Sequence, residues 1–253
     1  MWLALFKWTI MTLSFPPVFC AIDTVDVLRA IGLTTAVARA VAGIKLGLEF
    51  FHANGATGVQ AVREAGNGLP VFLDLKFHDI PATVASAVRG IMPLQLFMIN
   101  VHASGGRTMM RAAALACAEE ADRASVPRPL LVAVTVLTSL DAAAMAEIGI
   151  TAPVADQVVR LASLAQVCGL DGVVCSAHEV KRLRTCCGPD FRLVVPGVRP
   201  AWAGNDDQRR VLTPVEALAA GADILVIGRP ITTALDPATT AWRIAREIAA
   251  ARS

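Results

Sequence analysis

Eight short apolar runs recur along the chain, and segments with a helical period separate them. The runs begin roughly 20 to 40 residues apart, and the segments between them, such as residues 108–124 and 155–168, are rich in Ala, Leu, Val and Arg. Strands that alternate with helices indicate parallel βαβ units. We expect strands at Val18–Ile22, Gly43–Leu46, Val71–Leu75, Met98–His102, Leu130–Leu137, Gly172–Cys175, Leu193–Pro196 and Ile224–Ile227.

The number of runs and the length of the chain favour a closed barrel over an open sheet. The 253 residues are close to the roughly 250 that are typical of a (β/α)8 barrel. An open nucleotide-binding sheet would more often show a G-x-G-x-x-G turn after the first strand, and the sequence has none. We therefore predict an α/β protein with one domain, a (β/α)8 TIM barrel over residues 18–253.

Residues 1–17 are expected to form an apolar extension outside the barrel. A signal peptide carries its positive charge before its apolar core, whereas here Lys7 interrupts the apolar run. The run also falls short of the ~20 uninterrupted apolar residues of a membrane helix. We favour an upstream start codon, with Met11 as the true one, over a membrane-surface anchor.

The net charge and the cysteine content limit which binding partners and which cellular compartment are expected. The formal net charge is +2, Tyr is absent, and no basic cluster is interleaved with aromatic residues, so a nucleic acid is not expected as partner. The six cysteines show no metal-ligand spacing and lie mostly in apolar runs, which favours free thiols in a reduced, cytoplasmic protein. The neighbours Cys186 and Cys187 are placed in a predicted loop.

The densest cluster of charges lies at the end of the third run. Asp74 and Lys76 are two positions apart, so both side chains are expected on the same face of the strand. Asp79 follows just before Pro81, where a helix is expected to begin. Charges at a buried strand end are costly unless they are paired. Taken alone, this D-x-K-x-x-D pattern fits both a structural ion pair and an active site.

In barrels of this kind the chemistry lies at the carboxyl ends of the strands, and polar residues gather at those positions here. Each of the eight predicted strands carries or is followed by such residues, which is difficult to attribute to packing. They include Asp23, Lys45, Asp74, Lys76, His102, Thr138, Ser139, His178, Arg199 and Arg229.

The ends of the seventh and eighth strands predict a phosphate site. Arg199 and Arg229 can each form charge-assisted, bidentate bonds to phosphate oxygens, and Gly228 lets the backbone approach an anion. One G-R-P sequence is more often a plain strand-to-helix turn, but two such turns on consecutive strands favour the phosphate. The long polar loop after Arg199 is a candidate lid, in which Gln208 can add a neutral donor.

The histidines are interpreted as structural. His102 lies on a predicted strand, where a catalytic role is the alternative, and His78 is expected near a subunit interface. No two histidines have the spacing of metal ligands, so no metal site is predicted.

These motifs, in this order, resemble the bacterial form of the orotidine 5′-phosphate decarboxylase family. The resemblance covers the chain from about Val18 onward. It implies the conversion of orotidine 5′-monophosphate to UMP and CO2 in pyrimidine biosynthesis by a cytoplasmic homodimer, without cofactor or metal. The motifs that carry it are A-I-D-T, G-I-K-L-G, D-L-K-F-H-D-I-P-A-T, V-H-A-S-G-G, V-T-V-L-T-S, D-G-V-V-C-S-A, V-P-G-V-R-P, D-Q-R-R and V-I-G-R-P.

The resemblance also implies roles for single residues. Lys76 is expected to protonate C6 of the pyrimidine as CO2 leaves, beside Asp74, with Lys45 and Asp79 completing an alternating array of charges. Asp79 and Thr83 are expected to reach the site of the neighbouring subunit. The remaining residues are expected to bind the substrate, namely Asp23 and Lys45 the ribose, Thr138 the pyrimidine, and Arg199, Gln208, Gly228 and Arg229 the phosphate.

Two alternatives remain. Metal-dependent sugar-phosphate decarboxylases and aldolases of the same barrel superfamily share D-x-K-x-x-D, although F-H-D-I-P-A-T and D-Q-R-R argue against them. A chelator would abolish their activity. A non-catalytic phosphate-binding module attached to a membrane is the second alternative. Loss of Lys76 or Asp74 would have favoured it, and both residues are present.

Overall fold

The computed structural model describes residues 16–203 and 212–251 and contains a closed barrel of eight strands. Residues 1–15 and the predicted phosphate ligand Gln208 lie outside the described residues. The strands are β1 (Val18–Ile22), β2 (Gly43–Gly47), β3 (Val71–Phe77), β4 (Met98–His102), β5 (Leu130–Val134), β6 (Gly172–Val174), β7 (Arg192–Pro196) and β8 (Ile224–Ile227).

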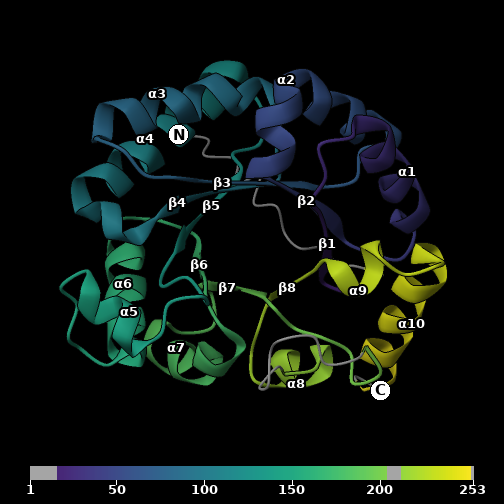
Figure 1. Cartoon of the computed structure of the whole chain (residues 1–253). Coiled ribbons are helices and arrows are strands. Elements are labelled where there is room, and N and C mark those ends of the chain that lie inside the picture. The colour runs from purple at the N-terminus through teal and green to yellow at the C-terminus, as the bar shows by residue number, and fades with distance from the viewer. Residues whose placement is uncertain (1–15, 204–211, 252–253) are drawn as a thin grey trace.

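Every strand pairs in parallel with the next one along the chain, and β8 returns to β1. The closing pairs are Val18 with Leu225, Phe19 with Val226 and Cys20 with Ile227. Figure 1 shows the strands in the middle of the molecule with the helices around them. The predicted α/β fold, a single-domain TIM barrel, is therefore confirmed.

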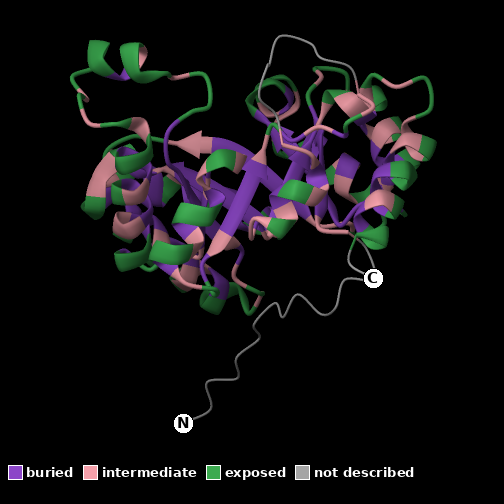
Figure 2. Cartoon of the chain, turned by 90° about the horizontal axis from the view of Figure 1, so that it is seen from below, coloured by how far each residue is buried: buried purple, intermediate pink, exposed green. Residues whose placement is uncertain are grey.

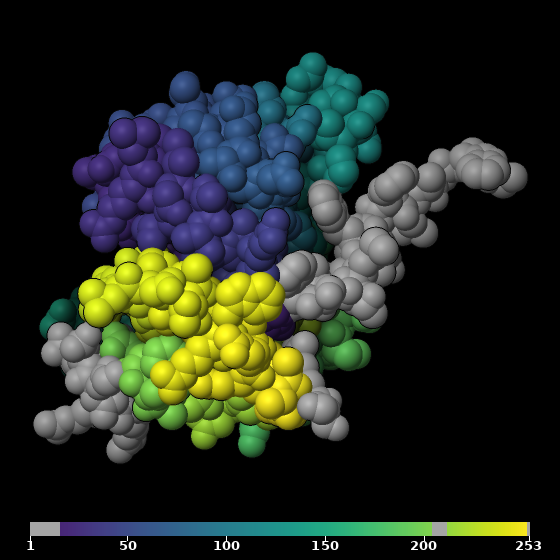
Figure 3. Space-filling model, turned by 90° about the vertical axis from the view of Figure 1, so that its right-hand side faces the viewer, coloured from purple at the N-terminus to yellow at the C-terminus, as the bar shows by residue number. Residues whose placement is uncertain are grey.

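The connections between strands are helical and form the outer layer. Figure 3 shows the C-terminal helices, in yellow, against the N-terminal part of the chain, in purple. The helices of six or more residues are α1 (Val27–Val37), α2 (Leu48–Ala65), α3 (Pro81–Ile91), α4 (Gly106–Ala124), α5 (Ala142–Glu147), α6 (Val154–Val167), α7 (Val180–Cys187), α8 (Pro214–Ala219) and α10 (Pro237–Ala250), and α9 (Arg229–Thr232) is a single turn.

The apolar residues form two clusters because side chains along a strand alternate in direction. The smaller cluster fills the interior of the barrel and includes Phe19, Phe72 and Met98. The larger one, which includes Leu73 and Ile99, lies between the strands and the helices. Strands covered on both faces are buried along most of their length, as the largely purple strands of Figure 2 show.

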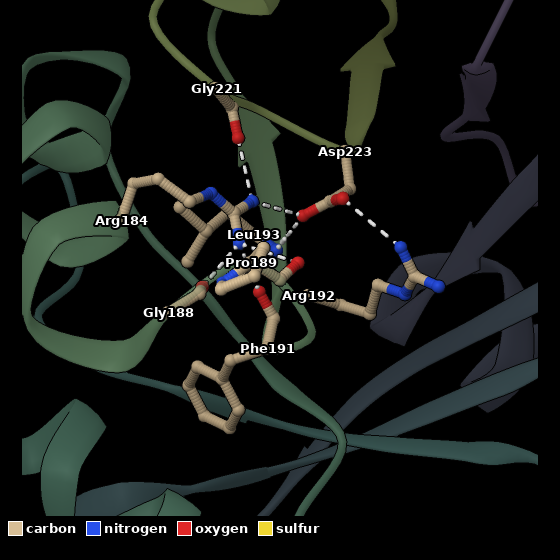
Figure 4. A network of polar contacts seen from close by, with 8 residues as sticks. All are labelled: Arg184, Gly188, Pro189, Phe191, Arg192, Leu193, Gly221 and Asp223. Carbon is tan, nitrogen blue, oxygen red and sulfur yellow. Dashed lines mark hydrogen bonds and ion pairs between the residues drawn. The ribbon is translucent and has the colours of Figure 1, made fainter.

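Ion pairs tie the amino ends of the strands together on the rim opposite the strands' carboxyl ends. Asp223, just before β8, binds Arg184 of α7 and Arg192 of β7 (Figure 4). The remaining donors of Arg184 bind four backbone carbonyls, those of Gly188, Pro189, Phe191 and Gly221. Asp171, just before β6, binds Arg128 in the same way. We call this set of ion pairs the lower rim.

Two local predictions were wrong. Cys186 and Cys187 form the end of α7 and not a loop, with Cys186 exposed and Cys187 buried. β5 ends at Val134, before the predicted Leu137, and Val136 and Leu137 line a cavity beyond the end of the strand. α2 begins directly after β2 and runs across a break at Gly55, whose φ is 58°.

Candidate active site

A cavity of about 220 Å³ opens at the carboxyl ends of the strands. A larger hollow of about 510 Å³ lies elsewhere, between the ends of α1 and α2 and Trp242, and Arg39 is the only charged residue that lines it. The volume of a cavity therefore does not identify the candidate site. The charged side chains that line the smaller cavity do. The smaller cavity is lined by Lys45, Phe72, Asp74, Lys76, Val134, Val136, Leu137, Thr138, Val174, Cys175, Pro196 and Val226.

Four charged side chains at the ends of β1, β2 and β3 form a row of alternating sign. Lys45, Asp74 and Lys76 line this cavity, and Asp23, directly after β1, pairs with Lys45. Lys45 Nζ lies 3.3 Å from Asp23 Oδ1 and 3.4 Å from Asp74 Oδ2. Lys76 Nζ lies 2.7 Å from Asp74 Oδ1. The carboxylate of Asp74 is therefore shared by two ammonium groups, one at each oxygen. The sequence analysis predicted these residues at the ends of neighbouring strands. The parallel pairing of β1 with β2 and of β2 with β3 brings them together.

Burial strengthens the interactions within this row. The side chains of Lys45 and Asp74 are each 11% exposed, while that of Asp23 is 56% exposed. Burial alone would raise the pKa of Asp74, but the charges of Lys45 and Lys76 and hydrogen bonds from Lys76 and Asn100 outweigh it. The pKa of Asp74 consequently lies below its ordinary value of 3.8, and the carboxylate is ionised at neutral pH.

The backbone of β3 departs from strand geometry where it presents these charges. Leu73 pairs with Ile99 and Phe77 with Val101, so three residues of β3 lie opposite the single residue Asn100 of β4. Lys76 has a φ of 51°, a left-handed conformation that costs roughly 1–2 kcal/mol for an L-residue. Asp74 and Lys76 nevertheless face the same cavity, as expected, and the departure from a regular strand is confined to the backbone at Lys76 and the register shift.

Asn100 is a residue of this site that the sequence analysis missed. Its side chain donates to Asp74 Oδ1 at 2.7 Å and accepts from the backbone N–H of Lys76 at 2.8 Å. It is completely buried. The sequence does carry a signal for it, because Asn100 is an uncharged polar residue in the otherwise apolar run Met98–Val101. Its position faces inward, next to the strand that carries the charges.

Asp79 and Thr83 lie outside the cavity of their own chain. Both are exposed, Asp79 in the turn after β3 and Thr83 in the first turn of α3. Asp79 Oδ1 accepts from the N–H of Ile80 at 2.6 Å, and within the described ranges Asp79 forms no ion pair. The single chain therefore does not bring Asp79 into the row of charges.

The predicted phosphate residues lie after β7 and β8. Gly228 and Arg229 directly follow β8, and Arg199 follows β7. A Cβ at Gly228 would lie 3.3 Å from the Cβ of Ala21 on β1, so a glycine allows a close approach of the two strand ends. Thr138 borders the cavity after β5.

The two histidines near the site lie side by side. The rings of His78 and His102 have centroids 5.3 Å apart. Burial lowers the pKa of His102, and the neighbouring His78 and Lys76 lower it further against an opposing effect of Asp74. His102 is therefore neutral at neutral pH, which fits the predicted structural role better than that of a proton donor.

Residues 16–203 and 212–251 contain neither a cluster of metal-binding side chains nor a helix suited to span a bilayer. In these ranges, no three His, Cys, Asp or Glu side chains are gathered in the way that would hold a metal ion. Over the same residues, no helix is long and apolar enough to cross a membrane.

Known proteins are similar to this chain over most of its length. The model of a family described as "Orotidine 5'-phosphate decarboxylase / HUMPS family" matches residues 16–244. An orotidine 5′-phosphate decarboxylase from Rhodospirillum rubrum is 57% identical over 232 residues, which cover 92% of this chain and 94% of that protein. One from Paramagnetospirillum magneticum is 54% identical over 232 residues, 92% of this chain and 98% of that protein.

Solved structures agree with these sequence matches. The crystal structure of orotidine 5′-phosphate decarboxylase from Lactobacillus acidophilus has a TM-score of 0.79 and 34% identity, covering 92% of this chain and 99% of that one. The description of the matching family names two groups, and both relatives carry the first of the two names.

Proposed function

The chain belongs to the orotidine 5′-phosphate decarboxylase family, and from that premise we propose how its residues share the reaction. The resemblance seen in the sequence motifs is confirmed at the level of the family. The reaction converts orotidine 5′-monophosphate to UMP and CO2, a step of pyrimidine biosynthesis, which makes the protein a carboxy-lyase. The row of alternating charges at the cavity is the observation on which the proposed roles rest.

Lys76 is the proposed acid. Loss of CO2 leaves an electron pair on C6 of the pyrimidine, which the ring delocalises poorly. An ammonium group fixed beside C6 stabilises this charge only as it develops, and then donates its proton to C6. Lys76 is supported for this role because Asp74 holds its ammonium group at 2.7 Å and its side chain borders the cavity.

Asp74 is proposed to lie beside the carboxylate that leaves. The lowered pKa of Asp74 keeps its negative charge in place, and repulsion between the two carboxylates is relieved as CO2 departs. Lys45 and Asp23 are proposed to bind hydroxyl groups of the ribose, since their ion pair lies at the exposed end of the row. Thr138, at the cavity border, is proposed to contact the pyrimidine.

The phosphate is proposed to bind where β7 and β8 end. Arg199 and Arg229 supply charge, and Gly228 gives access to the backbone. Gln208 is proposed as an additional donor on sequence grounds alone. Contacts to the phosphate, which takes no part in bond breaking, can supply binding energy for the strain at the reacting end.

A second copy of the chain is proposed to complete the site. Asp79 and Thr83 are exposed and outside the cavity of their own chain, so they are free to reach that of a neighbour. The carboxylate of Asp79 would then continue the row beyond Lys76 with the correct sign. We also propose that the homodimer is cytoplasmic and that it needs neither a cofactor nor a metal ion.

The experiment that tests these roles follows the fall in ultraviolet absorbance of orotidine 5′-monophosphate. Wild-type protein, Lys76→Ala and wild type with EDTA are compared at equal concentrations. We expect rapid turnover that resists EDTA and is lost in Lys76→Ala. Turnover that EDTA abolishes would exclude the metal-independent mechanism, and an active Lys76→Ala would exclude Lys76 as the acid.

A further inference from the structure

Asn100 is a fully buried polar residue inside the barrel, and both ends of its amide are used. Its Oδ1 accepts from the backbone N–H of Lys76 at 2.8 Å, and its Nδ2 donates to Asp74 Oδ1 at 2.7 Å. The orientation of the amide is unambiguous, since an N–H must meet the oxygen and a carboxylate must meet the NH2 group. One side chain thus binds the two residues proposed to act on the substrate.

The position of Asn100 in the sheet explains why these bonds matter. It is the single β4 residue opposite residues 74–76 of β3, where the register shifts. Within this bulge Lys76 adopts a φ of 51°, which an L-residue keeps only when its surroundings hold it there. The bond from the N–H of Lys76 to Asn100 is a contact of this kind.

We propose that Asn100 is a positioning residue for the decarboxylation, which holds the Lys76 backbone in its left-handed conformation and the Asp74 carboxylate in its orientation. The inference rests on the proposed roles of Lys76 and Asp74. Their two charged groups must meet the substrate on either side of one carbon–carbon bond. Because the carboxylate and the backbone from which the ammonium group extends are fixed by the same amide, neither can shift without loss of a hydrogen bond inside the barrel.

The chemistry of the contact leaves little choice of residue. Aspartate would keep the acceptor for Lys76 but set a second negative charge against Asp74. Leucine, of similar volume, would keep the packing and leave the N–H of Lys76 without that acceptor. These two changes, Asn100→Asp and Asn100→Leu, therefore test the electrostatic and the hydrogen-bonding part of the proposal separately.

The test compares both variants with Met98→Leu, which alters the same strand and the same barrel interior away from the charges. We expect kcat to fall by about 100-fold or more in both Asn100 variants, because small displacements of reacting groups have effects of this size. For Asn100→Leu the KM and the Kd of UMP, which lacks the scissile carboxylate, should stay within about threefold of wild type. Met98→Leu should retain wild-type kcat.

A purely structural role predicts a different pattern. The thermal midpoint would then fall in Asn100→Leu while kcat per folded molecule stayed at the wild-type value, and this result would overturn the proposal. If Asn100→Leu does not fold, Asn100→Asp at low temperature decides in the same way. Lys76→Ala is run in parallel, because an active Lys76→Ala refutes the proposed function, whereas inactive Lys76→Ala with active Asn100 variants refutes only this inference.

Discussion

Lys45 Nζ lies 3.4 Å from Oδ2 of Asp74, and both side chains are only 11% exposed. Asp74 binds Lys76 through its other oxygen, so the carboxylate joins two ammonium groups that would otherwise repel each other inside the cavity. Asp74 is therefore required both for the stability of this end of the barrel and for the charge that meets the substrate. The contribution to stability can be measured through its dependence on pH.

Replacing Asp74 by Asn should abolish most turnover and destabilise the protein. We expect kcat to fall at least about 100-fold, since the charge next to the scissile bond is lost. The pKa of Asp74 is below 3.8 when folded, so its ionised form contributes stability above pH 3.8 that is lost as the pH falls through the folded pKa. In urea titrations the stability difference between wild type and Asp74→Asn should be constant from about pH 5 to 7 and shrink below about pH 4. A difference that persists unchanged at about pH 3 would contradict this linkage.

A methyl group at Gly47 should disturb the ribose end of the row. A Cβ at this position would lie 3.1 Å from Lys45 Nζ and 3.3 Å from Asp23 Oδ1. We expect Gly47→Ala to lower kcat/KM by roughly 10-fold through displacement of this ion pair. The control is Gly32→Ala on α1, where nothing lies within 4 Å of the added carbon. It should stabilise the helix by about 0.5–1 kcal/mol and leave kcat/KM unchanged. Equal kinetics for the two variants would refute the prediction.

The lower rim should contribute to stability without affecting turnover. Arg184→Ala removes a donor from each of four backbone carbonyls and one of the two arginine partners of Asp223, which keeps its ion pair with Arg192. We expect it to cost about 2–4 kcal/mol of the free energy of unfolding, with kcat unchanged at a temperature where the variant is folded. Arg182→Ala is the matched control on the same helix. Its partner is Asp156, and because that pair is half exposed, its loss should cost less than about 1 kcal/mol. A large drop in kcat for Arg184→Ala would show that the rim is coupled to the site.

Subunits with different defects should complement each other if Asp79 acts across an interface. Each heterodimer of Lys76→Ala and Asp79→Ala contains one site with both residues intact. Because half of randomly assorted dimers are heterodimers, a refolded equal mixture should regain about a quarter of wild-type activity. Each variant refolded alone is the control. Absence of recovery in a mixture shown to contain heterodimers would place Asp79 outside the partner's site.

The thiols should differ sharply in reactivity. Cys186 is the one exposed cysteine of the six, and all six lie among the described residues. Burial raises the pKa of Cys20 to about 12 and that of Cys117 to about 11, which suppresses their thiolates as well as their access. We expect a brief treatment with a thiol reagent to give a single adduct by intact mass, and none in Cys186→Ser. Several rapid adducts on the native protein would contradict the burial of the others.

The features predictable from sequence were those encoded in local patterns. The strands Val18–Ile22, Met98–His102 and Ile224–Ile227 were predicted with their observed bounds, because apolar runs between polar ends leave little choice. The gathering of Asp23, Lys45, Asp74 and Lys76 at one edge also followed, since in a parallel barrel neighbouring strand ends lie together. The start of α2 could not be predicted from the sequence, because the glycines and the asparagine in its first half disfavour a helix. Buried contacts, such as those of Phe50, stabilise the helix there.

The left-handed Lys76 and the role of Asn100 depend on contacts between strands that are 24 residues apart in the chain. No local pattern encodes a register shift in which residues 74–76 face a single residue of the next strand. The alternation of side chains along a strand therefore predicted which charged groups share a face. It did not predict the left-handed backbone at Lys76 or the register shift between β3 and β4. Sites of this kind depart from local rules because the surrounding fold holds the strain.

The pairing of β1 with β8 also bears on how the protein is made. Residues 18–20 have no partner on that side until residues 225–227 have left the ribosome, so a nascent chain carries an open sheet edge through most of its synthesis. Lys45 is translated early, but the cavity that it lines also includes Val226 of β8 and cannot close before that strand arrives. Activity should therefore appear abruptly at the end of translation, and the open edge makes the unfinished chain a natural client for chaperones.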